Sequence, residues 1–174
     1  MMTALDRGRF AQAVTGLLIV VGSATIATAW GFQLIGGYVP CKLCLEQRMP
    51  YYVGLPLALL SLLTLLGRRA GVATVLLLLV AGIFAYGAAL GIYQAGAEWQ
   101  FWAGPSDCGG GTASPTSAAN MLQALQTTRV VSCTEASWRL LGLSFAGWNA
   151  VASAALSLLA LGAAGLARNA DKRI

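Results

Sequence analysis

The sequence predicts an all-α integral membrane protein, a four-helix bundle with one long extramembrane loop that carries a short amphipathic helix. Three observations predict this class. Hydrophobic residues make up 57% of the 174 residues and charged residues only 10%, whereas about a quarter of the residues of an average soluble protein are charged. Four apolar stretches are each about as long as a membrane span. The basic residues gather outside these stretches. The length leaves room for one membrane domain, residues 1–174.

The four predicted spans cover residues 12–36, 45–66, 72–94 and 144–167. The second is the least apolar, because charged residues and Pro50 lie in its first turns. Only five residues separate the second span from the third, so these two helices should be antiparallel neighbours. The first apolar run could also belong to a cleaved signal peptide, but it is longer than the hydrophobic region of a typical signal. We therefore expect an uncleaved helix.

The many glycines fit this class of protein. In lipid, small residues let helix backbones approach one another closely. Gly87 and Gly91 lie four residues apart in the third span, on one face of the helix. We expect them to mark a close contact between helices and to carry no chemistry.

Seven of the eleven basic residues fall at one end of the predicted bundle: Arg7, Arg9, Arg68, Arg69, Arg168, Lys172 and Arg173. Basic and acidic residues balance at the other end. By the positive-inside rule, the basic end and both termini are cytoplasmic, and loops 37–44 and 95–143 lie in the periplasm of a bacterial inner membrane. The net charge of +5 is thus a topology signal. No basic stripe remains to indicate nucleic-acid binding.

The long loop begins with aromatic residues suited to a membrane interface and continues through a glycine run. Between Thr116 and Val130, apolar residues recur at helical spacing among polar ones. A short amphipathic helix lying on the lipid surface fits this pattern.

All four cysteines fall in the two loops of the balanced end: Cys41 and Cys44 in the first, Cys108 and Cys133 in the second. In an oxidising compartment, two disulfides are the expected arrangement. A disulfide within the Cys41-Lys42-Leu43-Cys44 motif stabilises little because its ring is small, whereas this spacing is typical of disulfides that open and close. Redox chemistry is therefore the sharper hypothesis. A zinc site is disfavoured, because the chain has no histidine and no second CxxC.

Arg48 is the charged residue most indicative of function, because a cation at the membrane-facing start of a span is costly. It follows Cys44 by four residues. If the second helix begins near the CxxC motif, the two side chains share a face, and both the cation and the helix N-terminus favour a thiolate. Snorkelling of Arg48 to the interface is the alternative.

Two cysteine pairs on one side of a membrane suggest a relay. An incoming dithiol would reduce the outer pair, and the electrons would pass to the inner pair beside the membrane. The sequence contains no Rossmann, haem-attachment or iron–sulfur pattern. A membrane quinone is therefore the economical final acceptor.

The segment Pro40-Cys41-Lys42-Leu43-Cys44, followed by Arg48, resembles the motif of the DsbB family. The stretch from Cys133 through Trp138 to Trp148 resembles the family's approach to its fourth helix. The resemblance implies a protein disulfide oxidase that reoxidises a periplasmic DsbA-like thioredoxin-fold protein and reduces ubiquinone or menaquinone.

By this resemblance, the partner attacks a Cys108–Cys133 disulfide through Cys108, and exchange then reduces Cys41–Cys44. Cys44 would face the quinone as a thiolate stabilised by Arg48. Relatives often carry a histidine near the end of the third helix, where this chain has Tyr93-Gln94. Gln94 can hydrogen-bond a quinone oxygen but cannot act as an acid, so water would supply the protons.

Two other functions remain open at this point. Vitamin K epoxide reductase-like proteins also combine four helices with a CxxC, although their motif usually lies late in the chain. A non-enzymatic membrane scaffold or small transporter with two structural disulfides is the other. It predicts inert cysteines and no bound quinone.

Overall fold

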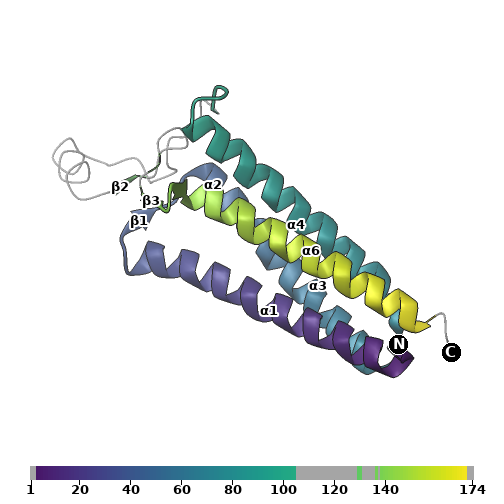
Figure 1. Cartoon of the computed structure of the whole chain (residues 1–174). Helices are drawn as coiled ribbons and strands as arrows, with labels where there is room; N and C mark the ends of the chain where they lie inside the picture. The colour runs from purple at the N-terminus through teal and green to yellow at the C-terminus, as the bar shows by residue number, and fades with distance from the viewer. Residues whose placement is uncertain (1–2, 105–128, 131–135, 137, 172–174) are drawn as a thin grey trace.

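The computed structural model of the chain describes residues 3–104, 129–130, 136 and 138–171. It confirms the predicted membrane four-helix bundle (Figure 1). Four long helices form it: α1 (Ala4–Leu34), α3 (Met49–Leu66), α4 (Ala70–Glu98) and α6 (Phe145–Asp171). A short helix, α2 (Lys42–Glu46), precedes α3.

Each of the four spans is long and apolar enough to cross a membrane. Only 22% to 39% of the residues in the most apolar window of each span are buried inside the bundle. Large aliphatic side chains therefore cover much of the outer surface, as lipid contact requires. The expected loop 37–44 is partly helical, since α2 covers Lys42–Glu46. The expected loop 95–143 begins later than predicted, because the polar Gln94 does not end α4, which continues to Glu98.

The helices form a closed ring of contacts in which α1 touches α3 and α6, and α4 touches α3 and α6. Helices α4 and α6 approach each other closely at Gly91. A Cβ atom at this position would lie only 2.8 Å from the backbone nitrogen of Ala150. At Gly87 a Cβ atom would press on Pro50 and Ser153. The expectation that these glycines permit close helix approach is confirmed.

Among the described residues, a small hydrophobic cluster forms around Cys41 and Leu43, and two large ones join the long helices. One lies toward the end that carries the chain termini and consists largely of small residues: Ala11, Leu65, Ala73, Leu77, Ala163, Ala164 and Ala167. The other lies nearer the middle and includes the larger side chains Leu18, Tyr51, Phe84 and Leu156. Side chains therefore become larger and more varied toward the cysteine end.

The chain turns between α2 and α3 at Gln47 and Arg48. Pro50 accounts for this break, because proline has no N–H to donate and its ring would clash with the carbonyl of Glu46 in a continuous helix. The break places Arg48 at the N-cap of α3. The helix that the sequence suggested around both Cys44 and Arg48 is thus two segments.

Short strands close the cysteine end. Strand β1 (Tyr38–Val39) pairs in parallel with β2 (Arg129–Val130), and β3 (Arg139–Leu140) forms a tight antiparallel hairpin with β4 (Leu143–Ser144). Most of the segment expected to form an amphipathic helix, Thr116–Val130, lies outside the described residues, and its last two residues form β2.

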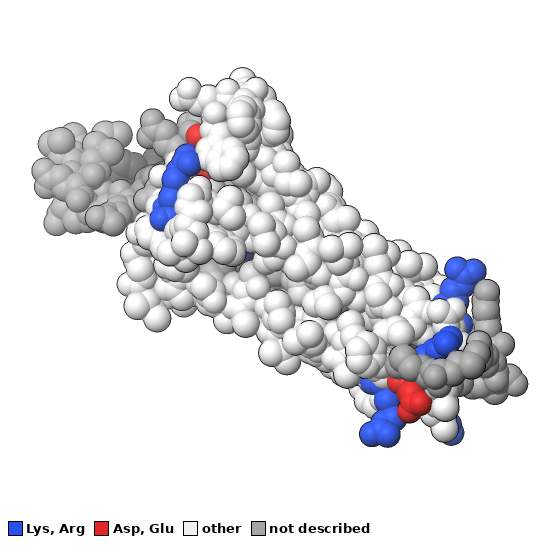
Figure 2. Space-filling model, in the orientation of Figure 1, with Lys and Arg blue, Asp and Glu red and all other residues white. Residues whose placement is uncertain are grey.

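The charged residues lie at the two ends of the molecule, and the surface between them is uncharged in the view of Figure 2. Basic side chains gather at the end with both termini, where the helix bounds place Arg7, Arg9, Arg68, Arg69 and Arg168. The segment with Cys41 and Cys44 lies at the opposite end of the bundle (Figure 1).

Candidate functional site

The CxxC motif forms the first turn of α2. Cys41 is its N-cap, and the Cys41 sulfur accepts a hydrogen bond from the backbone nitrogen of Cys44 at 3.2 Å. The two sulfurs lie 2.8 Å apart, with the Cys41 thiol donating to Cys44. Cys41 is fully buried, while Cys44 is partly exposed. The local turn alone therefore holds the two sulfurs close enough for a disulfide between them to form and open.

The environments of the two thiols differ. The hydrogen bond donated to Cys44, followed by burial, raises the pKa of Cys41. Cys41 therefore keeps its proton, and negative charge in the reduced pair resides on Cys44, which accepts the hydrogen bond. A thiolate is the form of cysteine that attacks or donates electrons.

A chain of hydrogen-bonded amides, of which Gln94 and Gln47 are buried, leads away from Cys44. Gln94 Nε2 lies 3.5 Å from the Cys44 sulfur, and Gln94 Oε1 accepts from Gln47 Nε2 at 2.6 Å. Gln47 Oε1 in turn accepts from Asn149 Nδ2 at 2.7 Å, and Asn149 accepts from the Tyr51 hydroxyl at 2.9 Å. The chain joins three helices to the CxxC turn, and because each amide is satisfied on both sides, it fixes their orientation.

Arg48 is nearly buried and points toward α1. Its guanidinium donates to Gln33 Oε1 at 2.6 Å and to the carbonyl of Ala29 at 3.3 Å, and lies 5.3 Å from the centre of the Trp30 ring. These contacts fix its position, whereas a snorkelling side chain would extend to the interface. The sequence predicted that Arg48 and Cys44 lie on the same face of one helix, one turn apart. In the structure they belong to two helical segments, and both line the same pocket.

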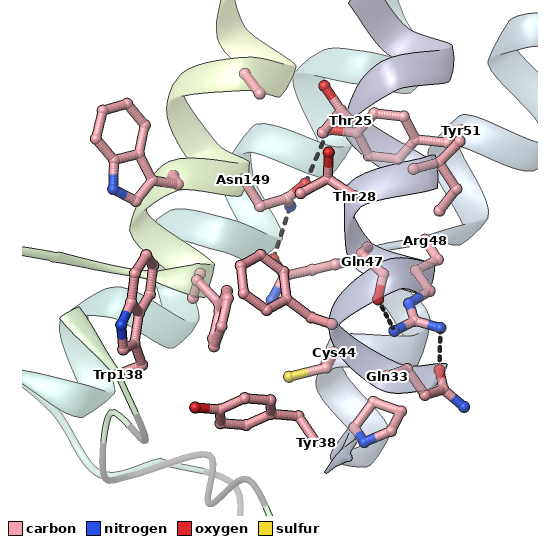
Figure 3. Close-up of a pocket in the computed structure, with 18 of the residues that line it drawn as sticks. Thr25, Thr28, Gln33, Tyr38, Cys44, Gln47, Arg48, Tyr51, Trp138 and Asn149 are labelled. Atoms are coloured by element: carbon pink, nitrogen blue, oxygen red, sulfur yellow. Dashed lines mark hydrogen bonds between the residues drawn. The ribbon is translucent and has the colours of Figure 1, made fainter. Parts of the chain in front are cut away.

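A pocket of about 530 Å³ opens between α1, α2, α3 and α6 (Figure 3). The residues that line it include Thr25, Thr28, Gln33, Tyr38, Cys44, Gln47, Arg48, Tyr51, Trp138 and Asn149. Its volume lies in the range of small-molecule sites, and its lining is mainly apolar with a few convergent polar groups, which is typical of such sites. Cys44 and Arg48 both reach this pocket, whereas Cys41 does not line it.

Four aromatic rings form the wall of the pocket near the loops. Phe145 packs against Phe32 at 4.9 Å, Tyr38 at 5.7 Å and Trp138 at 5.1 Å between ring centres. Residues from α1, β1, the segment before β3 and α6 thus meet in one cluster. Flat apolar walls of this kind suit a planar ring.

Two of the five predicted site residues, Cys44 and Arg48, line one pocket, and a third, Cys41, lies directly beside Cys44. Cys108 and Cys133 lie outside the described residues. The β1–β2 pairing nevertheless brings Val130, three residues before Cys133, beside Val39, two residues before Cys41. The two loops that carry the cysteines therefore meet at this pairing.

Sequence reasoning missed several site residues. Gln94 was named from the sequence as able to hydrogen-bond a quinone oxygen, but its contact with the sulfurs and Gln47 was missed, and it does not line the pocket. Glu98 was assigned to a loop, yet it is buried one turn after Gln94. Its spacing of four residues from Gln94 is a signal that could have indicated a shared helix face. Gln33 and Asn149 gave no such signal, because their partners are distant in sequence.

The fold and the site define a class of protein, a multi-pass membrane protein in which one cysteine of a close pair lines a pocket inside the bundle. The family model for disulfide bond formation protein DsbB matches residues 11–163. No curated protein and no solved structure matches the chain. The family match covers most of the sequence, so the chain belongs to the DsbB family of membrane disulfide bond formation proteins, as the resemblance of its motifs predicted.

Proposed function

We propose that this protein is a thiol:quinone oxidoreductase that reoxidises a periplasmic DsbA-like thioredoxin-fold protein and passes the electrons to ubiquinone or menaquinone. One observation carries the proposal: Cys44, half of a close dithiol, lines a mainly apolar pocket inside a membrane bundle, together with Arg48. A cysteine pair that served only as a structural disulfide would need no such pocket.

The pocket fits a quinone head group. Its aromatic wall suits a planar ring, and Arg48 and Asn149 keep N–H groups that can donate hydrogen bonds to ring oxygens. The pocket lies among apolar helices, from which a lipid-soluble substrate can approach. A bound quinone supplies the two-electron acceptor.

The charge of Arg48 acts on Cys44 and on the substrate. A fixed guanidinium at the pocket wall favours the Cys44 thiolate and the negative charge that develops on an acceptor oxygen. Gln33 and Ala29 hold the guanidinium in place, so little reorganisation is needed when that charge appears. Arg48 is therefore proposed as the quinone-binding residue.

Cys41, Cys44, Cys108 and Cys133 are proposed as the catalytic residues. The partner's thiolate attacks the Cys108–Cys133 disulfide and forms a mixed disulfide at Cys108, and exchange then reduces Cys41–Cys44. The pairing of β1 with β2 supports this exchange, because it tethers the two cysteine loops together. The basic residues at the other end of the bundle support cytoplasmic termini and periplasmic cysteines in a bacterial inner membrane.

The test is quinone reduction by protein purified in detergent, followed by quinone absorbance, with two electron donors. A reduced DsbA-type partner should support turnover, and dithiothreitol should reduce Cys41–Cys44 directly. Cys44→Ser should abolish turnover with both donors. Cys108→Ser should abolish it only with the protein partner.

The same assay contains the contradicting outcomes. Absence of quinone reduction by folded, disulfide-bonded wild-type protein, with either quinone, would favour structural disulfides. Full activity of Cys44→Ser with either donor would remove the CxxC motif from the reaction. Circular dichroism and thermal unfolding of each variant check that the bundle is intact.

A further inference from the structure

Glu98 is a carboxylate buried at the cysteine end of the bundle. It is the last residue of α4 and only 8% exposed. Gln94 Nε2 approaches Glu98 Oε1 at 3.4 Å, and the Ser144 hydroxyl lies within hydrogen-bonding reach. Glu98 Oε2 has no hydrogen-bond partner, and within the described part of the chain it is the one buried side-chain oxygen or nitrogen in that position.

Gln94 connects this carboxylate to the dithiol. The same Nε2 that approaches Glu98 lies 3.5 Å from the Cys44 sulfur and 3.9 Å from the Cys41 sulfur. Gln94 is 1% exposed, and its oxygen is occupied by Gln47. One amide group, itself buried, thus bridges a buried carboxylate and both sulfurs.

The charges around Glu98 depend on the redox state of the dithiol. Among the described residues, Arg139 from β3 and Cys44 from α2 interact electrostatically with Glu98. Arg48 is occupied by Gln33 on the other side of Cys44. A Cys41–Cys44 disulfide carries no charge, whereas the reduced pair places a thiolate close to the Glu98 carboxylate. Two negative charges that share one amide donor in a buried place are costly, and binding a proton removes one of them.

We propose that Glu98 takes up a proton whenever the Cys41–Cys44 disulfide is reduced and releases it when the disulfide re-forms. Reduction adds two electrons and one proton to the disulfide and gives the Cys41 thiol and the Cys44 thiolate. A second proton converts the Glu98 carboxylate to the acid. Oxidation releases both protons, the number that a quinone needs with two electrons to become a quinol. Glu98 acts through Gln94 and is a positioning residue, not a catalytic one.

This inference rests on the proposed function, because it requires the Cys41–Cys44 pair to cycle between dithiol and disulfide. It supplies a proton-carrying group close to the sulfurs in a chain without histidine. The sequence suggested water as the source of protons for the quinone, and Glu98 adds a buried carboxyl group one amide away from the cysteine pair.

The test is the reduction potential of the Cys41–Cys44 pair as a function of pH, in quinone-free full-length protein. The protein is equilibrated in dithiothreitol buffers from pH 6 to 7.5, and the oxidation state of these two cysteines is read by alkylation and mass spectrometry. Each proton taken up with the electron pair changes the equilibrium tenfold per pH unit, or about 30 mV. Wild-type protein should show about twice the slope of Glu98→Gln.

Glu46→Gln is the matched control, because Glu46 is an exposed carboxylate in α2, two residues after Cys44. It should retain the wild-type slope. Equal slopes for wild type and Glu98→Gln would overturn the inference while leaving the proposed function intact. A pair that stays in one redox state in every buffer would instead contradict the proposed function.

A spectroscopic measurement covers the case in which Glu98→Gln does not fold. The infrared difference spectrum of wild-type protein, reduced minus oxidised, should contain a carbonyl band of a protonated carboxylic acid. Glu46→Gln should retain this band, and a folded Glu98→Gln should lose it. A wild-type spectrum without the band would show that no carboxyl group is protonated on reduction and would overturn the inference.

Discussion

The two halves of the bundle are built from the same four helices but from different kinds of contact. Near the termini, Ala11, Ala73, Ala163, Ala164 and Ala167 pack with leucines in an apolar cluster. Near the cysteines, the helices are joined by an amide chain and surround a pocket. A polar side chain inside a membrane protein is costly unless it finds a hydrogen-bond partner within the protein. Such groups are therefore rare and usually mark a functional site. The comparison separates the half that holds the fold from the half to which we assign the proposed chemistry.

Substitution of Arg48 should have the largest effect among changes to a non-cysteine residue of the pocket. Arg48→Gln removes the fixed positive charge from the pocket wall, and we expect quinone reduction to fall by about 10² to 10³-fold, the usual cost of losing an electrostatic donor. Steady-state quinone absorbance measures this effect. Arg69→Gln, at an exposed position of the other end, is the control and should keep wild-type turnover. A similar loss in both variants would mean that overall charge, and not the pocket cation, controls the rate.

The two thiols of the CxxC motif should label at different rates. Since the pKa of Cys41 is raised, its thiolate fraction stays low as the pH rises toward 9. We expect iodoacetamide to modify Cys44 at least about tenfold faster than Cys41 in reduced protein between pH 7 and 9. Mass spectrometry of singly labelled peptides gives the ratio. Equal labelling would show that Cys41 ionises as readily as its neighbour.

The amide chain can be compared with an isolated amide in the other half. Gln94→Leu removes the donor to Cys44 and leaves the Gln47 amide without its acceptor, so we expect turnover to fall by about tenfold and unfolding free energy by about 1–3 kcal/mol. Gln12→Leu removes one hydrogen bond to the carbonyl of Leu65 and should cost about 1 kcal/mol with no loss of turnover. Equal turnover of the two variants would erase the distinction between the halves.

The smallest effect on activity is expected from the small-residue cluster. Ala164→Leu places a large side chain where Ala164 is 2% exposed, and overpacking of this kind costs about 1–3 kcal/mol. Thermal unfolding in detergent should detect the loss. Turnover at 25 °C should stay at the wild-type level, because the pocket lies at the other end. A large fall in turnover with unchanged stability would show that the two halves are coupled.

Local patterns in the sequence were sufficient for the class of fold. The lengths of four apolar stretches predicted four spans, and the spacing of Gly87 and Gly91 predicted a close helix contact, because both depend on residues near one another in the chain. The CxxC motif likewise fixes its own geometry, since one helical turn brings Cys41 and Cys44 together. Arg48 was recognised by the cost of placing a cation at the start of a span.

Only the tertiary structure decided what surrounds those residues. Gln33 reaches Arg48 across 15 positions, Gln94 reaches Cys44 across 50, and Asn149 reaches Gln47 across 102. No period or motif encodes such pairs, because they depend on how helices rotate and cross when they pack. For the same reason Glu98, which looks like a loop residue in the sequence, becomes a buried carboxylate beside the dithiol. The sequence by itself determined the helices and the close pair of cysteines, and the packing of the helices determined the pocket, the position of the cation and the neighbouring carboxyl group.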